Sequence, residues 1–359
     1  MKAALILENG RVFYGQSIGD SSERVFEMVF NTSMVGYQEA LTDPSYTGQG
    51  VIMTYPLIGN YGVNKEDNET GHVWPEALII RRLSERGSNF RCEGSLGEYL
   101  KENGVTGIED VDTRELTRIL RDEGTMNAMI TARDFCLDEV LKRIRDYRIK
   151  KPVYRVTRSE PLNIKGNGPK VALMDFGVKR GMVQCLVKRG CDVTVLPATT
   201  GAEEILRGGY DGLMLSGGPG DPKDCADIVR ELSIIYESDI PVFGVCLGHQ
   251  LMALATGADT VKLKYGHRGG NHPVRDLTRN RVYITSQNHG YTVLADSVKP
   301  EVAEVSHINA NDKTVEGLVY KRRHIFTVQF HPEACPGPAD TEYLFDEFIS
   351  MIKGCQVNA

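Results

Sequence analysis

Short apolar runs of strand length alternate with stretches of helical length through the second half of the chain. The runs KVALMDFG, CDVTVLPA, YDGLMLSGG and IPVFGVC are separated by stretches such as 178–189 and 222–236. This alternation predicts a doubly wound, mostly parallel sheet, because each right-handed crossover lays its helix on one sheet face. Further β runs follow, and a helix over 340–354 closes the domain. We expect functional residues at the carboxyl ends of the strands.

The first 150 residues show a different pattern, which predicts a β-rich α+β domain. Two apolar runs flank Asn9-Gly10, a dipeptide that favours a hairpin turn because both residues tolerate positive φ. Further on, VDTRELTRILRDEG places Asp112 three residues before Glu115, then apolar residues at helical spacing, then Gly124. We predict a capped amphipathic helix there. Proline and glycine between 151 and 169 indicate a linker, so the domains are expected at 1–150 and 170–359.

Length and charge narrow the class of protein. A chain of 359 residues suits two domains, and 42 basic against 48 acidic residues without long charge runs argue against a nucleic acid or an anionic membrane as partner. The first apolar stretch ends at Glu8, which is too short for a signal peptide, and no run is long enough to span a membrane. We expect a soluble cytoplasmic protein.

The cysteines indicate neither a disulfide framework nor a zinc site. Eight are scattered along the chain without a C-x-x-C pair, at positions 92, 136, 185, 191, 225, 246, 335 and 355. We expect free thiols, most of them small packing residues. Only Cys246 departs from that expectation.

Cys246 stands between Gly244 and Gly248, where an apolar run feeds a helical stretch. A strand that ends in Gly-Xaa-nucleophile-Xaa-Gly makes a tight elbow, which lifts the nucleophile clear of the sheet. The start of the helix supplies a positive dipole end and free N–H groups, which favour a thiolate and can hold an oxyanion. The alternative from this motif alone is a buried cysteine in an ordinary turn.

A thiolate nucleophile needs a proton carrier, and QFHPEA supplies a candidate. His331 and Glu333 follow a strand two residues apart, so in an extended backbone their side chains project to the same side. The carboxylate then orients the imidazole. The alternative for an isolated His-Pro-Glu is a turn with a solvated glutamate.

The stretch LSGGPGDP ends another strand on glycines, which expose backbone N–H groups suited to a carboxamide oxygen or an oxyanion. The alternative is a tight turn alone. The chain contains no Gly-Lys dipeptide and therefore no Walker loop, so ATP chemistry is expected on another polypeptide.

Several histidines lie in KYGHRGGNHPV and TSQNHGY. The spacing of His267, His272 and His289 fits no common metal-ligand pattern, so we expect hydrogen-bonded histidines and no metal. Asn288 and Gly290 are suited to contact a polar substrate.

Together, SGGPGDP, GVCLGHQ, GHRGGNHPV, SQNHGY and HPEA resemble class I glutamine amidotransferases, which have a Cys-His-Glu triad and a flavodoxin-like sheet. The first region resembles the N-terminal domain of carbamoyl-phosphate synthase small subunits in VFNTSMVGYQEALTDPSYTGQ, TYPLIGNYG and DVDTRELTRILR. The resemblance covers essentially the whole chain.

The resemblance implies roles for individual residues. Cys246 is the nucleophile, His331 and Glu333 complete the triad, and the backbone N–H groups of Gly218 and Leu247 form the oxyanion hole. The implied glutamine contacts are Ser45, Gly218, Gly220, Leu247, Gln250, Asn288, Gly290 and Tyr291. Two positions depart from the family pattern: Gly217, where asparagine is frequent, and Tyr291, where phenylalanine is.

The implied activity is hydrolysis of L-glutamine to glutamate and ammonia through a thioester. The resemblance further implies that ammonia passes to a large subunit, in a heterodimer or a higher oligomer of heterodimers, which makes carbamoyl phosphate from bicarbonate and ATP. No cofactor is expected on this chain, and ATP and Mg²⁺ are expected on the large subunit. The alternatives are a stand-alone amidase or γ-glutamyl hydrolase and a catalytically silent glutamine-sensing module.

Overall fold

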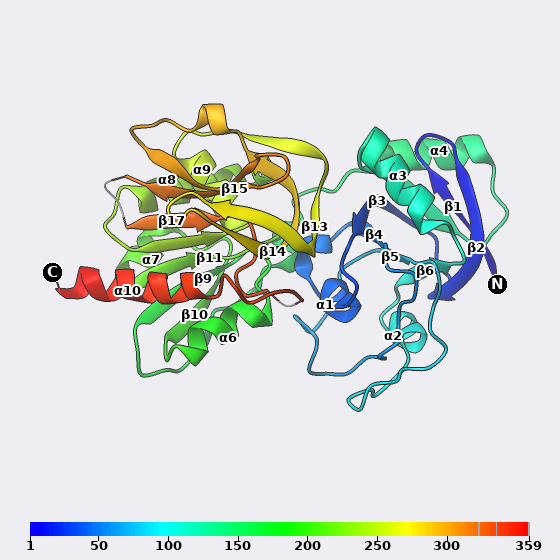
Figure 1. The fold of residues 1–359 in the computed structure, drawn as a ribbon, viewed down its shortest axis with the longest axis horizontal. Helices are drawn as coiled ribbons and strands as arrows, with labels where there is room; N and C mark the ends of the chain where they lie inside the picture. The colour runs from blue at the N-terminus through cyan, green and yellow to red at the C-terminus, as the bar shows by residue number, and fades with distance from the viewer. Residues whose placement is uncertain (322–323, 335, 358–359) are drawn as a thin grey trace. The chain divides into compact units, whose positions relative to one another are not determined.

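The computed structural model describes residues 1–321, 324–334 and 336–357, and side chains through 355. The chain divides into two compact units, Met1–Lys150 and Lys151–Ala359, which are described separately below. Figure 1 shows the course of the chain through both.

Seven strands of the first unit close into a barrel in the order β1-β2-β6-β5-β4-β3-β7. They are β1 Lys2–Leu7, β2 Val12–Gly19, β3 Arg24–Asn31, β4 Gln49–Met53, β5 Ala77–Ile79, β6 Thr106–Glu109 and β7 Met126–Thr131. The predicted hairpin at Asn9-Gly10 is confirmed: β1 and β2 pair antiparallel, and Gly10 has a φ of 86°. The sequence indicated a β-rich domain but gave no sign that the sheet closes.

The helices of the first unit are short. They are α1 Tyr37–Leu41, η1 Pro44–Tyr46, α2 Leu96–Glu102, α3 Thr113–Glu123 and α4 Leu137–Asp146. Helix α3 confirms the predicted capped helix, because the Asp112 carboxylate accepts the N–H of Glu115 at 2.9 Å and Gly124 follows the last turn with a φ of 99°. Its apolar face packs into the barrel core through Leu116 and Leu120.

Ten strands of the second unit form one sheet in the order β14-β13-β15-β16-β17-β12-β11-β9-β10-β8. The predicted parallel sheet is its centre, where β10, β9, β11, β12 and β17 run parallel in the flavodoxin-like order. The other five strands pair antiparallel, so the parallel part is half of the sheet. The bounds are β8 Leu162–Ile164, β9 Lys170–Asp175, β10 Asp192–Pro197, β11 Gly212–Leu215, β12 Val242–Val245, β13 Thr260–Asp276, β14 Arg281–Val293, β15 Ala303–Asn309, β16 Val315–Tyr320 and β17 Ile325–Val328.

Helices cover both faces of this sheet (Figure 1). One apolar cluster joins α7, α8 and α9 to the sheet, and a second joins α6 and α10 to the opposite side of the same strands. Along β9, Val171 and Leu173 face the second cluster while Ala172 faces the first, as strand alternation requires. The bounds are α5 Val153–Val156, α6 Arg180–Lys188, α7 Ala202–Arg207, η2 Pro222–Cys225, α8 Ala226–Tyr236, α9 Leu247–Ala255, η3 Ala295–Ser297 and α10 Tyr343–Val357.

The stretch 151–169, expected as a linker, is instead part of the second unit. Val153 in α5 is fully buried in the core, and β8 pairs antiparallel with β10 at the sheet edge. The prolines and glycines indicated a linker because they lie around two short elements, α5 and β8, which are too short to show a helix or strand pattern in the sequence.

Among the described residues, every helix is too short or too polar to cross a membrane. The expectation of free thiols is confirmed for the seven described cysteines, whereas Cys335 lies outside the described residues.

Candidate active site

The carboxyl ends of four neighbouring parallel strands bring the candidate residues together. Lys179 follows β9, the glycine loop 216–220 follows β11, Cys246 follows β12, and His331 follows β17. Parallel strands end at the same sheet edge, so residues far apart in sequence meet there.

Cys246 adopts a strained backbone conformation between β12 and α9. Its φ of 52° and ψ of −105° are unfavourable for a residue with a Cβ, and its N–H donates to the carbonyl of Val328 at 2.8 Å, which fixes the turn. The residue is 2% exposed. This is the geometry of a nucleophile elbow.

Gly244 and Gly248 are required because the chain crosses itself closely at this elbow. A Cβ on Gly248 would lie 2.5 Å from Leu215 Cβ and 2.6 Å from the Leu215 carbonyl oxygen. A Cβ on Gly244 would lie 2.8 Å from Thr327 Cγ2 and 3.1 Å from the backbone of Gly248. No larger residue fits either position without moving a neighbouring strand.

His331 is held by Glu333 in the arrangement expected from QFHPEA. The Nδ1 of His331 lies 2.7 Å from Glu333 Oε1, and both residues are buried. Since a carboxylate only accepts, Nδ1 carries a proton and Nε2 is the nitrogen left to exchange protons. Burial and Lys179 oppose the imidazolium, but Glu333 and Cys246 outweigh them and raise the pKa of His331 above its usual range.

Lys179 is a residue of this site that sequence reasoning missed. Its Nζ lies 2.9 Å from the same Oε1 of Glu333, and the two side chains are 5% and 0% exposed. Burial opposes ionisation of Glu333, yet Lys179 and His331 hold the pKa of that carboxyl below its usual range. The available signal was a lysine directly after the first strand of the parallel sheet, in DFGVK.

Cys246 and His331 face each other across Gly217. A Cβ on Gly217 would lie 2.9 Å from His331 Cε1 and 3.6 Å from Cys246 Cβ. The thiol donates to the carbonyl of Asn288 at 3.7 Å, while Nε2 of His331 makes no hydrogen bond of normal geometry to any described residue. The sulfur nevertheless stabilises the imidazolium electrostatically. Long or poorly aligned hydrogen bonds between catalytic groups are common in structures without substrate.

The two residues expected to form an oxyanion hole lie side by side. A Cβ on Gly218 would approach Leu247 Cδ2 to 2.9 Å and the Phe176 carbonyl oxygen to 2.2 Å. Leu247 is the first residue of α9, so its N–H has no acceptor within the helix. Gly220 has a φ of 92°, which bends the glycine loop against Pro152.

The other residues of this unit that were expected to contact glutamine lie on one strand and one helix. Asn288, Gly290 and Tyr291 lie on β14, and Asn288 is next to the Cys246 thiol. Gln250 on α9 donates its amide to the Tyr291 carbonyl at 2.8 Å and to Gln329 Oε1 at 2.9 Å. Both amide hydrogens of Gln250 are therefore used to hold the wall of the site.

Ser45, the remaining expected glutamine contact, belongs to the first unit. It lies in η1, where the Asp43 carboxylate accepts its N–H at 2.9 Å. Its role in binding glutamine remains a prediction from the resemblance.

His267 and His289 are hydrogen-bonded, as expected for the histidines of the glycine-rich stretches, through Asp312, the Tyr291 carbonyl and Gln287. His267 Nδ1 and His272 Nε2 are buried without a hydrogen-bond partner among the described residues. The sequence pattern did not indicate which atoms surround His267, because Asp312 and Glu316 come from other parts of the chain.

Comparison with known proteins shows the family to which the chain belongs. The sequence model of the family "Glutamine amidotransferase class-I" matches residues 172–351, and that of "Carbamoyl-phosphate synthase small chain, CPSase domain" matches residues 5–130. The chain is 52% identical to the carbamoyl phosphate synthase small chain of Clostridium perfringens, over 97% of this chain and 99% of that protein. It is 49% identical to the protein of the same name from Listeria monocytogenes, over 98% of this chain and 97% of that protein.

The first match lies within the second unit and the second within the first unit, so the similarity covers both folds. This chain belongs to the carbamoyl phosphate synthase small chain family, with a class I glutamine amidotransferase domain as its second unit.

Proposed function

We propose that this chain hydrolyses the side-chain amide of L-glutamine, with Cys246 as nucleophile, and delivers the ammonia to a carbamoyl phosphate synthase large subunit. The observation that carries the proposal is the strained cysteine after β12, beside a buried histidine that is hydrogen-bonded to a glutamate at 2.7 Å. An unfavourable backbone conformation costs free energy, and such strain is found mostly at functional sites. A strained cysteine beside groups that can exchange protons therefore favours a nucleophile.

In this mechanism the Cys246 thiolate attacks the amide carbon, and the N–H groups of Gly218 and Leu247 receive the developing oxyanion. His331 Nε2 protonates the departing nitrogen as the carbon–nitrogen bond breaks, which leaves a thioester and ammonia. The same Nε2 then takes a proton from water, whose oxygen attacks the thioester. Glutamate leaves, and Cys246 recovers its thiolate while His331 is again protonated.

Glu333 and Lys179 act through His331 in this proposal. Glu333 fixes the tautomer and stabilises the imidazolium, and Lys179 keeps Glu333 ionised in a buried site. For substrate contacts we propose Gly218, Gly220, Leu247, Gln250, Asn288, Gly290 and Tyr291, with Ser45 contributed by the first unit.

Ammonia released into water at neutral pH becomes mostly ammonium, which is not a nucleophile. Direct transfer to a partner subunit is therefore chemically favourable. We propose that the large subunit holds ATP and Mg²⁺ and forms carbamoyl phosphate from bicarbonate.

The test is the Cys246→Ser variant assembled with a large subunit, with the exposed-thiol variant Cys136→Ser as matched control. We expect Cys246→Ser to lose glutamine-dependent synthesis and to retain synthesis from an added ammonium salt, while the control retains both. Loss of both activities in a correctly assembled Cys246→Ser complex would contradict the division of labour. Measuring glutaminase turnover with and without the large subunit separates a stand-alone amidase from a subunit.

A further inference from the structure

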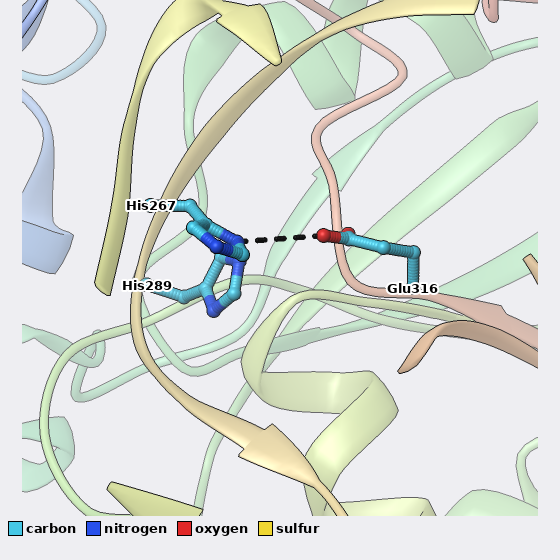
Figure 2. A group of neighbouring side chains, drawn as sticks. All are labelled: His267, His289 and Glu316. Carbon is cyan, nitrogen blue, oxygen red and sulfur yellow. Dashed lines mark ion pairs between the residues drawn. The ribbon is translucent and has the colours of Figure 1, made fainter. Parts of the chain in front are cut away.

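Three buried side chains from three strands converge in the second unit, outside the residues used above for chemistry. One donor atom each from His267 on β13, His289 on β14 and Glu316 on β16 lies within 4.8 Å of the others, and all three residues are buried. Figure 2 shows the two rings together with the carboxylate pointing toward them. We propose that His267, His289 and Glu316 bind a zinc ion.

The hydrogen bonds around the two rings fix which nitrogens point inward. His267 Nε2 lies 2.8 Å from Asp312 Oδ2, and His289 Nδ1 lies 2.7 Å from the carbonyl oxygen of Tyr291. Carboxylate and carbonyl oxygens only accept, so each of these nitrogens carries a proton. In the neutral rings, His267 Nδ1 and His289 Nε2 therefore present lone pairs to the centre of the cluster.

This is the arrangement in which histidines usually bind metals. A metal-bound histidine commonly donates its other N–H to a carboxylate or a backbone carbonyl, which orients the ring. The cluster contains one of each, in Asp312 and the Tyr291 carbonyl.

Gln287 supplies a second sign that a cation belongs here. Its Nε2 lies 3.2 Å from Thr285 Oγ1, and that hydroxyl donates its single proton to the His272 carbonyl at 2.9 Å. The hydroxyl must therefore accept from the amide of Gln287, which turns Gln287 Oε1 toward His289 Nε2 at 3.1 Å. His289 Nδ1 already donates to the Tyr291 carbonyl, so the neutral ring faces this oxygen with the lone pair of Nε2.

Two more atoms of the cluster lack hydrogen-bond partners among the described residues. His267 Nδ1 and Glu316 Oε2 make no hydrogen bond to any described residue, although His267 is 6% and Glu316 0% exposed. His267 Nδ1 lies 3.5 Å from Glu316 Oε1. Two ligands about 2.1 Å from a tetrahedral zinc ion lie about 3.4 Å apart, so this pair has the spacing that zinc requires.

The donor set and the charge favour zinc over other common ions. Two imidazoles with one carboxylate suit Zn²⁺, whereas Mg²⁺ and Ca²⁺ prefer oxygen ligands alone. Glu316 and Asp312 bring two negative charges to the cluster, and Arg268, which lies beside Gly290, brings a positive charge. The competing occupant is a second proton on His267.

The ion would tie three strands together directly behind the wall of the candidate active site. In the sequence, His289 lies between Asn288 and Gly290, and the carbonyl of Asn288 accepts a hydrogen bond from the Cys246 thiol. The inference does not rest on glutamine hydrolysis, because metal binding is measured on protein that has no such activity.

The experiment uses the full chain with Cys246→Ser, which removes the active-site thiolate as a rival ligand. After dialysis against a chelator, Co²⁺ is titrated while its visible absorption is followed, and Zn²⁺ is then titrated by calorimetry. We expect a tetrahedral cobalt spectrum that zinc abolishes and one zinc ion per chain. Glu316→Gln, which keeps the side-chain shape, should weaken zinc binding more than tenfold.

Two further variants keep the result decisive. Asp312→Asn changes a side chain that is 44% exposed and outside the ligand set, and should weaken binding about 10- to 100-fold even if Glu316→Gln does not fold. His307→Asn removes another buried imidazole of this sheet, from β15, and should leave zinc binding unchanged. The proposal is overturned if zinc does not bind, if Glu316→Gln and Asp312→Asn bind it as tightly as the parent, or if His307→Asn loses it. Absence of binding would identify a proton as the occupant of His267.

Discussion

Replacing Lys179 by methionine tests the electrostatic support of the candidate triad. The substitution leaves the Glu333 carboxylate buried with His331 as its remaining charged partner in the site. At 2.9 Å and an effective dielectric constant of about 20, the lost attraction is about 6 kcal/mol. Desolvation of the ammonium offsets part of this, and breaking a buried ion pair typically costs about 3–5 kcal/mol. We expect a loss of that size in the free energy of unfolding.

The measurement is urea denaturation followed by circular dichroism, with Lys188→Met as matched control. Lys188 is the last residue of α6, the helix that begins directly after Lys179, and it is exposed, so its replacement should change stability by about 0.5 kcal/mol or less. In a double-mutant cycle, adding Lys179→Met to Glu333→Gln should cost much less than adding it to the parent chain, because the neutral amide no longer needs the ammonium.

A second readout separates positioning of the triad from mere stability. Lys179 lowers the pKa of His331, so its removal should move the limb of the kcat/KM profile governed by His331 to higher pH. The reasoning is refuted if Lys179→Met matches Lys188→Met in stability and leaves the pH profile unchanged.

Three other predictions follow from single contacts. Burial raises the pKa of Glu39 to about 7, so in the folded protein this carboxyl keeps a proton that the unfolded chain releases above about pH 4.5. The free energy of unfolding therefore falls as the pH rises between these two values. In urea titrations, Glu39→Gln should raise the free energy of unfolding by about 1–3 kcal/mol at pH 8 and change it little at pH 4. Gly248→Ala places a Cβ 2.5 Å from Leu215 Cβ and should cost about 1–3 kcal/mol and lower glutaminase turnover, whereas Gly354→Ala, with open space around it, should do neither in melting and ammonia-release assays. Asp112→Ala removes the cap of α3 and should lower the free energy of unfolding by about 1 kcal/mol; an unchanged melting curve would contradict the capping role.

The sequence predicted the elements that carry local signals. The hairpin at Asn9-Gly10, the cap at Asp112 and the alternating strands and helices after residue 170 follow from short-range chemistry, and all are present. Closure of the barrel was not predictable, because it depends on pairing β3 with β7, about a hundred residues apart. The packing of residues 151–169 was not predictable for the same reason, because Val153 packs against core residues that come later in the chain.

The candidate site divides in a similar way. Cys246 and the pair His331 and Glu333 stand in motifs whose spacing has a mechanical reason, so the turn at Cys246 and the contact between His331 and Glu333 could be predicted from the sequence. Lys179 was not, because its partner Glu333 lies more than 150 residues away and a single lysine has no motif. The cluster of His267, His289 and Glu316 was missed because its ligands come from three strands, and spacing rules describe ligands from one loop or helix.

The order of the parallel strands sets when activity can appear as the chain folds. Cys246 leaves β12, but its N–H and its proton carrier depend on β17, the last strand of the sheet to be synthesised. A chain that emerges from the ribosome therefore carries its cysteine for more than eighty residues without the histidine that we propose as its proton carrier. The candidate site is therefore complete only when the second unit is nearly complete, so glutaminase activity, under the proposed function, would report the end of folding.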